Sequence, residues 1–266
     1  MNAILETLIR YLDNSALLDA SVIPWSSPVP TFGDLSRAKV ASLGLNPSNR
    51  EFVSGLGEEL DGPLRRFHTL KSLGISDWSD ANAYHLEKIA TSCVGYFSGN
   101  PYDAWFRRLD RIISGTQYSY YDAWFKACHL DLIPYATSRK WMDLTNQERT
   151  LLLDVSGDCL GFLLRDSPVR VLVLNGRSVV EHFQDISGYV LERREIPEWT
   201  LPRESNGGVV GIGYKGVIQN LCGYNLERDL LVLGFNHNIQ SSFGVTAQVI
   251  SSIRDWVARS AERSIQ

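Results

Sequence analysis

The sequence lacks any excess of basic residues. Its 266 residues include 26 Lys and Arg against 30 Asp and Glu, which gives a net charge of −4. A protein that coats nucleic acid usually carries a basic surface, so this balance argues against that class. The same charge balance is compatible with an enzyme that binds DNA transiently through one local patch. Arg107, Arg108 and Arg111 form such a local cluster, although solvated helix faces carry similar clusters.

Cysteine is scarce and widely spaced. The four cysteines stand at positions 93, 128, 159 and 222. None of them forms a Cys-x-x-Cys element, which argues against a zinc knuckle or an iron–sulfur cluster. No His, Asp and Glu cluster has the spacing of metal ligands either, so we expect neither a metal nor a cofactor. This pattern favours free buried thiols in a reducing compartment, and therefore a cytoplasmic protein.

Long apolar runs are also missing. No uncharged apolar stretch approaches twenty residues, so we expect no membrane span. Residues 1–20 predict an amphipathic helix interrupted by Glu6, Arg10 and Asp13, not a signal peptide. The sequence shows no repeat, no low-complexity tract and no linker. We therefore expect one domain over residues 1–266, and a monomer.

Four short apolar runs are present, each followed by a polar or glycine-containing turn. They cover residues 39–45, 129–135, 169–174 and 230–235. Runs of this length, rich in Val, Ile and Leu, are typical of strands buried on both faces of a parallel sheet. Helical patterns lie around residues 104–114, 146–165, 177–183 and 246–263. The alternation predicts an α/β fold, a three-layer sandwich with a central, mainly parallel four-stranded sheet flanked by helices.

Residues 192–225 depart from this alternation. Their glycine-rich segment Val-Val-Gly-Ile-Gly-Tyr-Lys-Gly-Val-Ile predicts a hairpin inserted before the last strand. Ligands of open parallel sheets bind beyond the carboxyl ends of the strands, so the turns after the four apolar runs are the places to look for a site. These turns begin at Asn46, Ala136, Asn175 and Asn236.

The first and last of these turns resemble catalytic motifs of the uracil-DNA glycosylase superfamily. Gly44-Leu45-Asn46-Pro47-Ser48 is similar to the Gly-x-Asn-Pro-Gly motif of the mismatch-specific branch. The Asn-His-Asn-Ile-Gln-Ser-Ser stretch that begins at Asn236 resembles the His-Pro-Ser or Asn-Pro-Ser loop after the final strand of that family. Between them, residues 96–106 are similar to the segment that bears the base-stacking ring. The motifs agree in order and spacing over residues 40–245.

The chemistry of a glycosylase gives these residues roles. Breaking an N-glycosidic bond requires a flipped base, a water on the far side of the sugar and donors aimed at the leaving base. An amide cannot remove a proton at neutral pH but can position a water, so the resemblance makes Asn46 the water-holding residue. The Asp of the fast branch, in Gly-Gln-Asp-Pro-Tyr-His, is absent, which implies slow turnover. The alternative is that Asn46-Pro47 is only a turn after a strand.

The resemblance also assigns roles to the residues of the second motif. Asn236 would contact the leaving base with His237 in support, whereas a single His in a loop is often only solvated. Ile239 and Gln240 occupy the place of the wedge that fills the gap left by the flipped base. Two hydroxyls suit phosphate contacts, those of Ser48 and Ser241.

Four further residues are candidates for the base pocket. Phe97 is our choice for the ring that stacks on the base, with Tyr102 as the competitor, and the alternative for both is core packing. Asp131 aligns with an Asn of the uracil readers. A carboxylate only accepts hydrogen bonds, so Asp131 fits the exocyclic amine of cytosine better than uracil, unless it merely caps a loop. Asp103 is either a helix N-cap or part of the pocket.

The resemblance therefore implies a monofunctional DNA glycosylase that acts on double-stranded DNA and removes a cytosine-type base. These departures from the uracil-reading pattern are similar to those of bacterial anti-phage glycosylases, which excise glucosylated hydroxymethylcytosine from phage DNA and leave abasic sites. Two other functions stay open. One is a repair glycosylase for uracil or mismatched thymine, and the other is a non-catalytic module that binds DNA or nucleotides.

Overall fold

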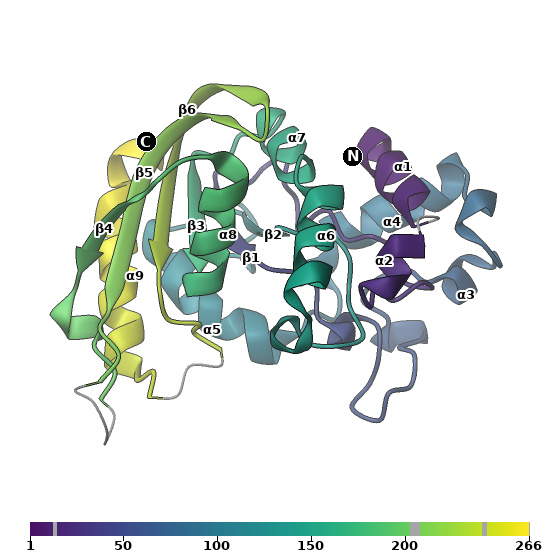
Figure 1. Ribbon diagram of the computed structural model, residues 1–266, viewed down its shortest axis with the longest axis horizontal. Helices are drawn as coiled ribbons and strands as arrows, with labels where there is room; N and C mark the ends of the chain where they lie inside the picture. The colour runs from purple at the N-terminus through teal and green to yellow at the C-terminus, as the bar shows by residue number, and fades with distance from the viewer. Residues whose placement is uncertain (13–14, 203–207, 241–243, 266) are drawn as a thin grey trace.

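One six-stranded sheet organises the protein, as a computed structural model shows (Figure 1). The structure describes residues 1–12, 15–202, 208–240 and 244–265. The order of the strands is β2-β1-β3-β6-β5-β4. Their bounds are β1 Val40–Gly44, β2 Ala127–Asp131, β3 Val171–Asn175, β4 Glu192–Glu195, β5 Ile212–Leu221 and β6 Tyr224–Phe235. The α/β fold is confirmed, but the expectation of a four-stranded sheet was wrong.

The four predicted strands form the parallel half of this sheet. β1 pairs with β2 and β3, and β3 pairs with β6, all in parallel. Every residue of β1, β2 and β3 is buried, as expected for apolar strands covered on both faces. β2 begins earlier than predicted, at Ala127. It also ends earlier, at Asp131, because the chain soon reaches Pro134, which has no N–H to donate.

The predicted hairpin insertion is part of the main sheet. β5 pairs antiparallel with β6, and β4 pairs antiparallel with β5. The β5–β6 turn places Cys222 and Gly223 at φ 48° and 83°, the left-handed conformations that a tight hairpin turn requires. β4 reads Glu-Arg-Arg-Glu and is exposed throughout, which protects the edge of the sheet from pairing with other chains.

Helices cover both faces of the sheet (Figure 1). α7 (Cys159–Arg165) and α8 (Arg177–Ser187) pack on one face, and α5 (Asp103–Ile113) and α9 (Ala247–Ile265) pack together on the other. The predicted helix over 146–165 is two helices, α6 (Asn146–Ser156) and α7. The break falls at Gly157, where a Cβ would lie 2.7 Å from the carbonyl oxygen of Leu153.

The N-terminal residues add a group of short helices at the β2 side of the molecule (Figure 1). They are α1 Asn2–Tyr11, α2 Ser15–Asp19, α3 Leu70–Leu73 and α4 Ala83–Val94. The predicted N-terminal helix is thus α1 and α2, and α1 packs against α4 and α7. In the part of the chain that the structure describes, no helix is long and apolar enough to cross a membrane. All four cysteines are free thiols.

Candidate active site at the carboxyl edge of the sheet

The strand order creates a switch point between β1 and β3. The chain leaves β1 toward β2 on one side, whereas β3 leads toward β6 on the other. In open α/β sheets, such a reversal opens a crevice beyond the carboxyl ends of the two strands. In Figure 1 the parallel strands end at the lower edge, where the loops that follow β1 and β6 lie. This edge carries most of the residues that the sequence singled out.

A row of register partners forms the floor of this edge. Gly44 pairs with Asp131 at the ends of β1 and β2, and Asn175 pairs with Phe235 at the ends of β3 and β6. Leu43 pairs with Leu174, so Gly44 and Asn175, one residue further on, are level with each other. Register partners in a parallel sheet have their side chains on the same face. Asp131 and Asn175 therefore lie on either side of Gly44, which has no side chain, and their two strands are roughly 10 Å apart.

The environment of Asn46 fixes the orientation of its amide. Nδ2 donates to Thr137 Oγ1 at 3.0 Å and faces the carbonyl oxygens of Pro47 and Tyr135 at 3.2 and 3.4 Å. The Thr137 hydroxyl donates in turn to the carbonyl of Arg139 at 2.7 Å, so it is free to accept from Asn46. Because oxygens surround Nδ2, Oδ1 points the other way. Among the described residues Oδ1 has no hydrogen-bond donor, and it is available to a water.

Asp131 lies at the end of a chain of buried polar contacts. Its Oδ1 lies 3.3 Å from His129 Nε2, and His129 Nδ1 lies 2.6 Å from Ser42 Oγ. Ser42 Oγ also lies 2.5 Å from the Tyr120 hydroxyl. Burial raises the pKa of Tyr120 well above its usual value, so Tyr120 keeps its proton and can donate to Ser42. Ser42 Oγ thus joins Tyr120 to His129 Nδ1 by hydrogen bonds, and the other ring nitrogen of His129 faces the Asp131 carboxylate as a close polar contact.

The order Asp131–His129–Ser42 matches that of a serine hydrolase triad, but the geometry does not serve that chemistry. Ser42 is fully buried on β1, and its Oγ lies between His129 and Tyr120. A nucleophile must be within reach of a substrate. The chain therefore orients and holds the Asp131 carboxylate, whose Oδ2 has no hydrogen-bond donor among the described residues.

Glu51 is a buried carboxyl group that the sequence analysis missed. It lies in the loop after Asn46, at the end of the short 3-10 helix Asn49–Glu51, and is only 3% exposed. Tyr96 donates its hydroxyl proton to Glu51 Oε2 at 2.7 Å, and Arg66 Nε lies 3.9 Å from the same oxygen. Burial raises the pKa of Glu51 to about 8, and the charge of Asp131 adds to the rise. In a polar Asn-Arg-Glu stretch, only the following Phe52-Val53 hinted that this side chain is buried.

Asn175, at the end of β3, is a second buried polar residue of this edge to which the sequence assigned no role. It is 2% exposed, its Nδ2 donates to Gln240 Oε1 at 3.0 Å, and its Oδ1 is buried without a partner. A buried acceptor without a donor costs about 1–3 kcal/mol, so an unpaired one at a strand end marks a position that a ligand can satisfy. Gln240 Nε2 lies 3.4 Å from the carbonyl oxygen of Trp105, which ties the last loop to α5.

The first two side chains of the second motif, Asn236 and His237, make their hydrogen bonds within the protein. Asn236 uses both ends of its amide where the chain enters β5, with Oδ1 accepting from Ile212 N at 2.9 Å and Nδ2 donating to Val210 O at 2.8 Å. His237 is buried, and its Nε2 lies 2.7 Å from the carbonyl oxygen of Trp199. Burial lowers the pKa of His237, so at neutral pH it is an uncharged ring that donates to this carbonyl.

The remaining residues of the last loop do not project as a wedge. Ile239 is fully buried, and Gln240 is half-buried with its amide engaged by Asn175. Ser241 lies outside the described residues. Ser48, in the first loop, is exposed and accepts a hydrogen bond from Arg50 N at 3.2 Å, which caps the short helix that carries Glu51.

The candidate base-stacking rings have different surroundings. Phe97 stacks on Tyr120 with ring centroids 4.7 Å apart, and Phe106 meets it edge-on. Tyr102 is half-buried, and the Arg66 guanidinium lies 5.5 Å from its ring centroid. The backbone N–H of Tyr102 donates to the Tyr96 hydroxyl at 2.9 Å, which brings this residue beside the Glu51 carboxyl.

Asp103 points away from this group. Its Oδ1 accepts from the Tyr121 hydroxyl at 2.6 Å, and its Oδ2 lies 3.2 Å from Arg107 Nε. Tyr102, not Asp103, is the N-cap residue of α5. Asp103 therefore acts as the first residue of the helix, where a negative charge is favourable.

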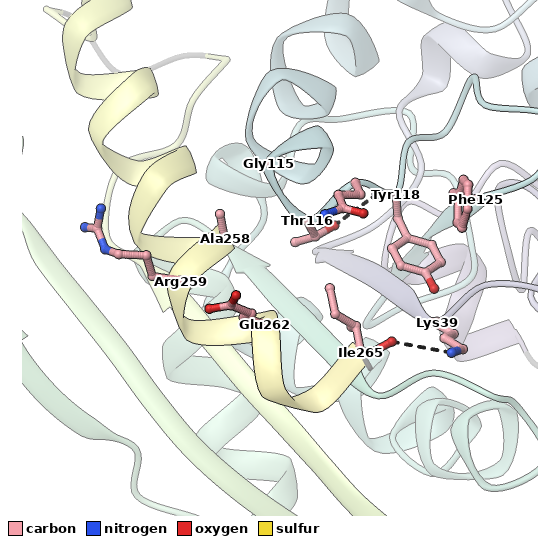
Figure 2. Close-up of a pocket in the computed structure, with 10 residues that line it drawn as sticks. Lys39, Gly115, Thr116, Tyr118, Phe125, Ala258, Arg259, Glu262 and Ile265 are labelled. Atoms are coloured by element: carbon pink, nitrogen blue, oxygen red, sulfur yellow. Dashed lines mark hydrogen bonds between the residues drawn. The ribbon is translucent and has the colours of Figure 1, made fainter.

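The opposite edge of the sheet carries a hollow of about 530 Å³ (Figure 2). Lys39, directly before β1, and Ile265, at the end of α9, both line it, and Lys39 Nζ donates to Ile265 O at 3.4 Å. In Figure 2 the Arg259 side chain extends away from Tyr118. This hollow lies at the amino ends of the strands, where α/β sheets rarely bind ligands. The described residues include no group of three or more His, Cys, Asp or Glu placed to hold a metal ion.

Compared with known proteins, the sequence matches no family model and no curated protein. Functional assignment therefore depends on the residues at the carboxyl edge of the sheet.

Proposed function

We propose that the protein is a DNA glycosylase that hydrolyses the N-glycosidic bond of a flipped, cytosine-type nucleotide. One observation carries this proposal. Asn46, Asp131 and Asn175 come from the ends of three adjacent strands, and each has an oxygen without a hydrogen-bond donor among the described residues. Such an edge suits a ligand that brings amine donors and positive charge.

Hydrolysis of the N-glycosidic bond of a cytosine-type nucleotide brings both an amine donor and positive charge. The C1′–N1 bond breaks with its electron pair leaving on the base, and the sugar becomes an oxocarbenium-like cation. A water then adds its oxygen to C1′, and the proton that it loses neutralises the negative charge on the released base. Asn46 Oδ1 holds this water by accepting one of its hydrogens, since the amide nitrogen is committed to Thr137. The partial negative charge of the same oxygen stabilises the cation.

Asp131 reads the base in this proposal. Its carboxylate accepts from the exocyclic amine of cytosine, whereas O4 of uracil would meet it acceptor to acceptor. The buried chain through His129 and Ser42 keeps the carboxylate in place. Tyr102 supports the base better than Phe97, because Tyr120 already covers one face of Phe97. Stacking on an aromatic ring contributes about 1–3 kcal/mol.

The resemblance in the sequence extends the proposal to glucosylated hydroxymethylcytosine in phage DNA, with abasic sites as the product and double-stranded DNA as the partner. Substituents of this kind sit on C5 of the base. Recognition through the exocyclic amine leaves C5 unused, so it is compatible with a bulky group there.

Base release under single-turnover conditions tests the proposal. Duplexes with one uracil, one thymine mismatch, one cytosine or one glucosylated hydroxymethylcytosine are incubated with excess protein, and free base is measured by mass spectrometry. We expect release of a cytosine-type base by the wild type and loss of at least a hundredfold in Asn46→Ala, with DNA binding retained. Lys39→Ala, at the opposite edge of the sheet, is the control.

The same experiment separates the other functions. Release of uracil or mismatched thymine, with no release of any cytosine-type base, would identify a repair glycosylase. DNA binding without release from any duplex, in wild type and Asn46→Ala alike, would identify a non-catalytic module and overturn the proposal.

A further inference from the structure

A second hollow, of about 510 Å³, lies beside α3 and α4. Its wall is formed by lining residues that are buried or half-buried, which are Arg65, His68, Ser72, Lys88 and Ser92. Ser72 belongs to α3, and Lys88 and Ser92 belong to α4. The wall is therefore polar and carries two cations.

The negative charge near this hollow lies at its rim. Among the lining residues, which all belong to the described part of the chain, Glu87 is the one acid, and it is exposed. Asp61 Oδ1 lies 3.9 Å from Arg65 Nη1, but the Asp61 side chain is 65% exposed. Exposed ion pairs at such distances are weak, so Arg65 can exchange this contact for a stronger anionic partner.

His68 reports the electrostatic potential inside the hollow. The ring is buried, and its Nδ1 lies 3.0 Å from Ser72 Oγ. Burial lowers the pKa of His68 to about 4, and the positive charges of Arg65 and Lys88 contribute to the fall. Both cations therefore act on one point in the wall. An anion placed there would meet a positive potential.

Contacts hold both cations in place. Lys88 Nζ lies 4.4 Å from the centroid of the Tyr84 ring, one turn earlier on α4. The backbone of Arg65 is extended, with φ −62° and ψ 133°, so the side chains of Arg65 and Arg66 point to opposite sides. Arg66 Nε donates to the carbonyl oxygen of Asn100 at 2.8 Å, whereas Arg65 lines the hollow. The hollow is thus separate from the candidate active site.

We propose that this hollow binds a phosphate group, which pairs with Arg65 and Lys88. The guanidinium can pair with two phosphate oxygens at once, and the ammonium acts as a point charge on another. Pockets of roughly 300–1,000 Å³ hold small-molecule ligands, so the hollow also has room for the rest of a nucleotide. A free nucleotide and a DNA backbone offer the same phosphate chemistry. Binding here does not depend on the proposed reaction.

An NMR titration of the full chain at neutral pH tests the proposal. The signal of the His68 ring is identified as the one that is missing in His68→Gln. It is followed while inorganic phosphate, deoxycytidine monophosphate or a short unmodified DNA duplex is added. We expect at least one of these probes to shift the signal to saturation. Tighter binding of phosphate or the nucleotide indicates a free ligand, whereas tighter binding of the duplex indicates the DNA backbone.

Two variants in the wall supply the comparison. Arg65→Gln and Lys88→Gln each remove one charge, so the Kd of the tightest probe should rise by about tenfold. If that probe is the duplex, the slope of log affinity against log salt should also fall by about 0.9 in each variant. Lys71→Gln is the matched control, because it removes one charge at an exposed position of α3 that does not line the hollow. Its Kd should stay at the wild-type value.

Two results would overturn the inference. One is that none of the three probes shifts the His68 signal. The other is that Arg65→Gln and Lys88→Gln bind as tightly as Lys71→Gln. Melting curves of each variant exclude unfolding as the cause. Because binding and not base release is measured, failure here leaves the proposed function standing, and absence of base release leaves this site standing.

Discussion

Gly44 and Asp131 are register partners, and a Cβ on Gly44 would lie 2.4 Å from Asp131 Oδ1. The same Cβ would lie 3.0 Å from two ring atoms of His129. Real Cβ atoms do not come so close to other atoms, so the carboxylate occupies space that only glycine leaves free. The Gly that opens the first motif is thus explained by packing against the buried Asp131–His129 pair, in addition to any role in the turn.

Gly44→Ala should therefore displace Asp131. Overpacking of this kind costs about 1–3 kcal/mol, and a shift of the carboxylate should also lower base release. Gly55→Ala is the matched control in the loop after β1, because the nearest atom to its Cβ, Arg50 Nη1, is 3.7 Å away. Urea unfolding and single-turnover release measure the two effects. Equal stability of the two variants would contradict the packing argument.

Glu51 should make the stability of the protein depend on pH. Its pKa is raised from an ordinary value of 4.5 to about 8 by burial, so the folded state binds the proton more tightly than the unfolded state. The stabilisation is complete below pH 4.5 and is lost as pH rises through 8. From pH 5.5 to 8.5 the wild type should lose roughly 3 kcal/mol that Glu51→Gln does not lose.

Urea unfolding of both proteins at the two pH values measures this difference. Glu181→Gln serves as the control, because Glu181 is exposed and forms only a surface ion pair with Arg177. Parallel losses in wild type and Glu51→Gln would show that Glu51 is ionised in the folded protein at neutral pH.

The sequence predicted the parallel strands because their apolar runs are continuous, and it located Asn46 because that residue follows the first run. It could not predict the level row of Asp131, Gly44 and Asn175. Such a row depends on the register between strands that are far apart in the chain. The six-stranded sheet was missed for a related reason, since β5 alternates exposed and buried residues and reads as a free-standing hairpin.

The sequence also could not predict which single polar or loop residues are buried. Glu51 stands in a polar stretch, and only the tertiary contact with Tyr96 shows that it is enclosed. Ile239 follows two Asn residues and a His, a composition typical of an exposed loop, yet it is fully buried. In both cases the deciding partners come from segments distant in sequence, which local patterns do not reveal.

Asn236→Ala should destabilise the fold. The substitution leaves Ile212 N and Val210 O without their partners where β5 begins, which costs about 1–3 kcal/mol. Asn220→Ala, at an exposed position of β5 whose side chain makes no hydrogen bond in the part of the chain that is described, should change stability by less than about 0.5 kcal/mol. Chemical unfolding of both variants compares them. A tolerated Asn236→Ala would favour the base-contacting role that the sequence suggested.

Lys140→Ala should weaken DNA binding if the loop after β2 approaches phosphates. Lys140 is exposed in the loop that also carries Thr137, and it forms no ion pair with any described residue. Loss of one phosphate contact should reduce the slope of log affinity against log salt by about 0.9. Binding titrations at several salt concentrations measure the slope, with Lys39→Ala as the control at the opposite edge. An unchanged slope would place the DNA elsewhere.

Ser42→Ala tests whether the Asp131–His129–Ser42 chain is structural or nucleophilic. As a structural link, its loss leaves His129 Nδ1 and the Tyr120 hydroxyl without a buried partner, and the free energy of unfolding should fall by about 1–3 kcal/mol. Ser251→Ala, on the exposed side of α9, should cost nothing comparable. The wild type should also resist a fluorophosphonate probe, because Ser42 is fully buried. Labelling of Ser42, with ester hydrolysis lost in Ser42→Ala, would instead assign the chain to nucleophilic catalysis and leave Asp131 as its orienting carboxylate.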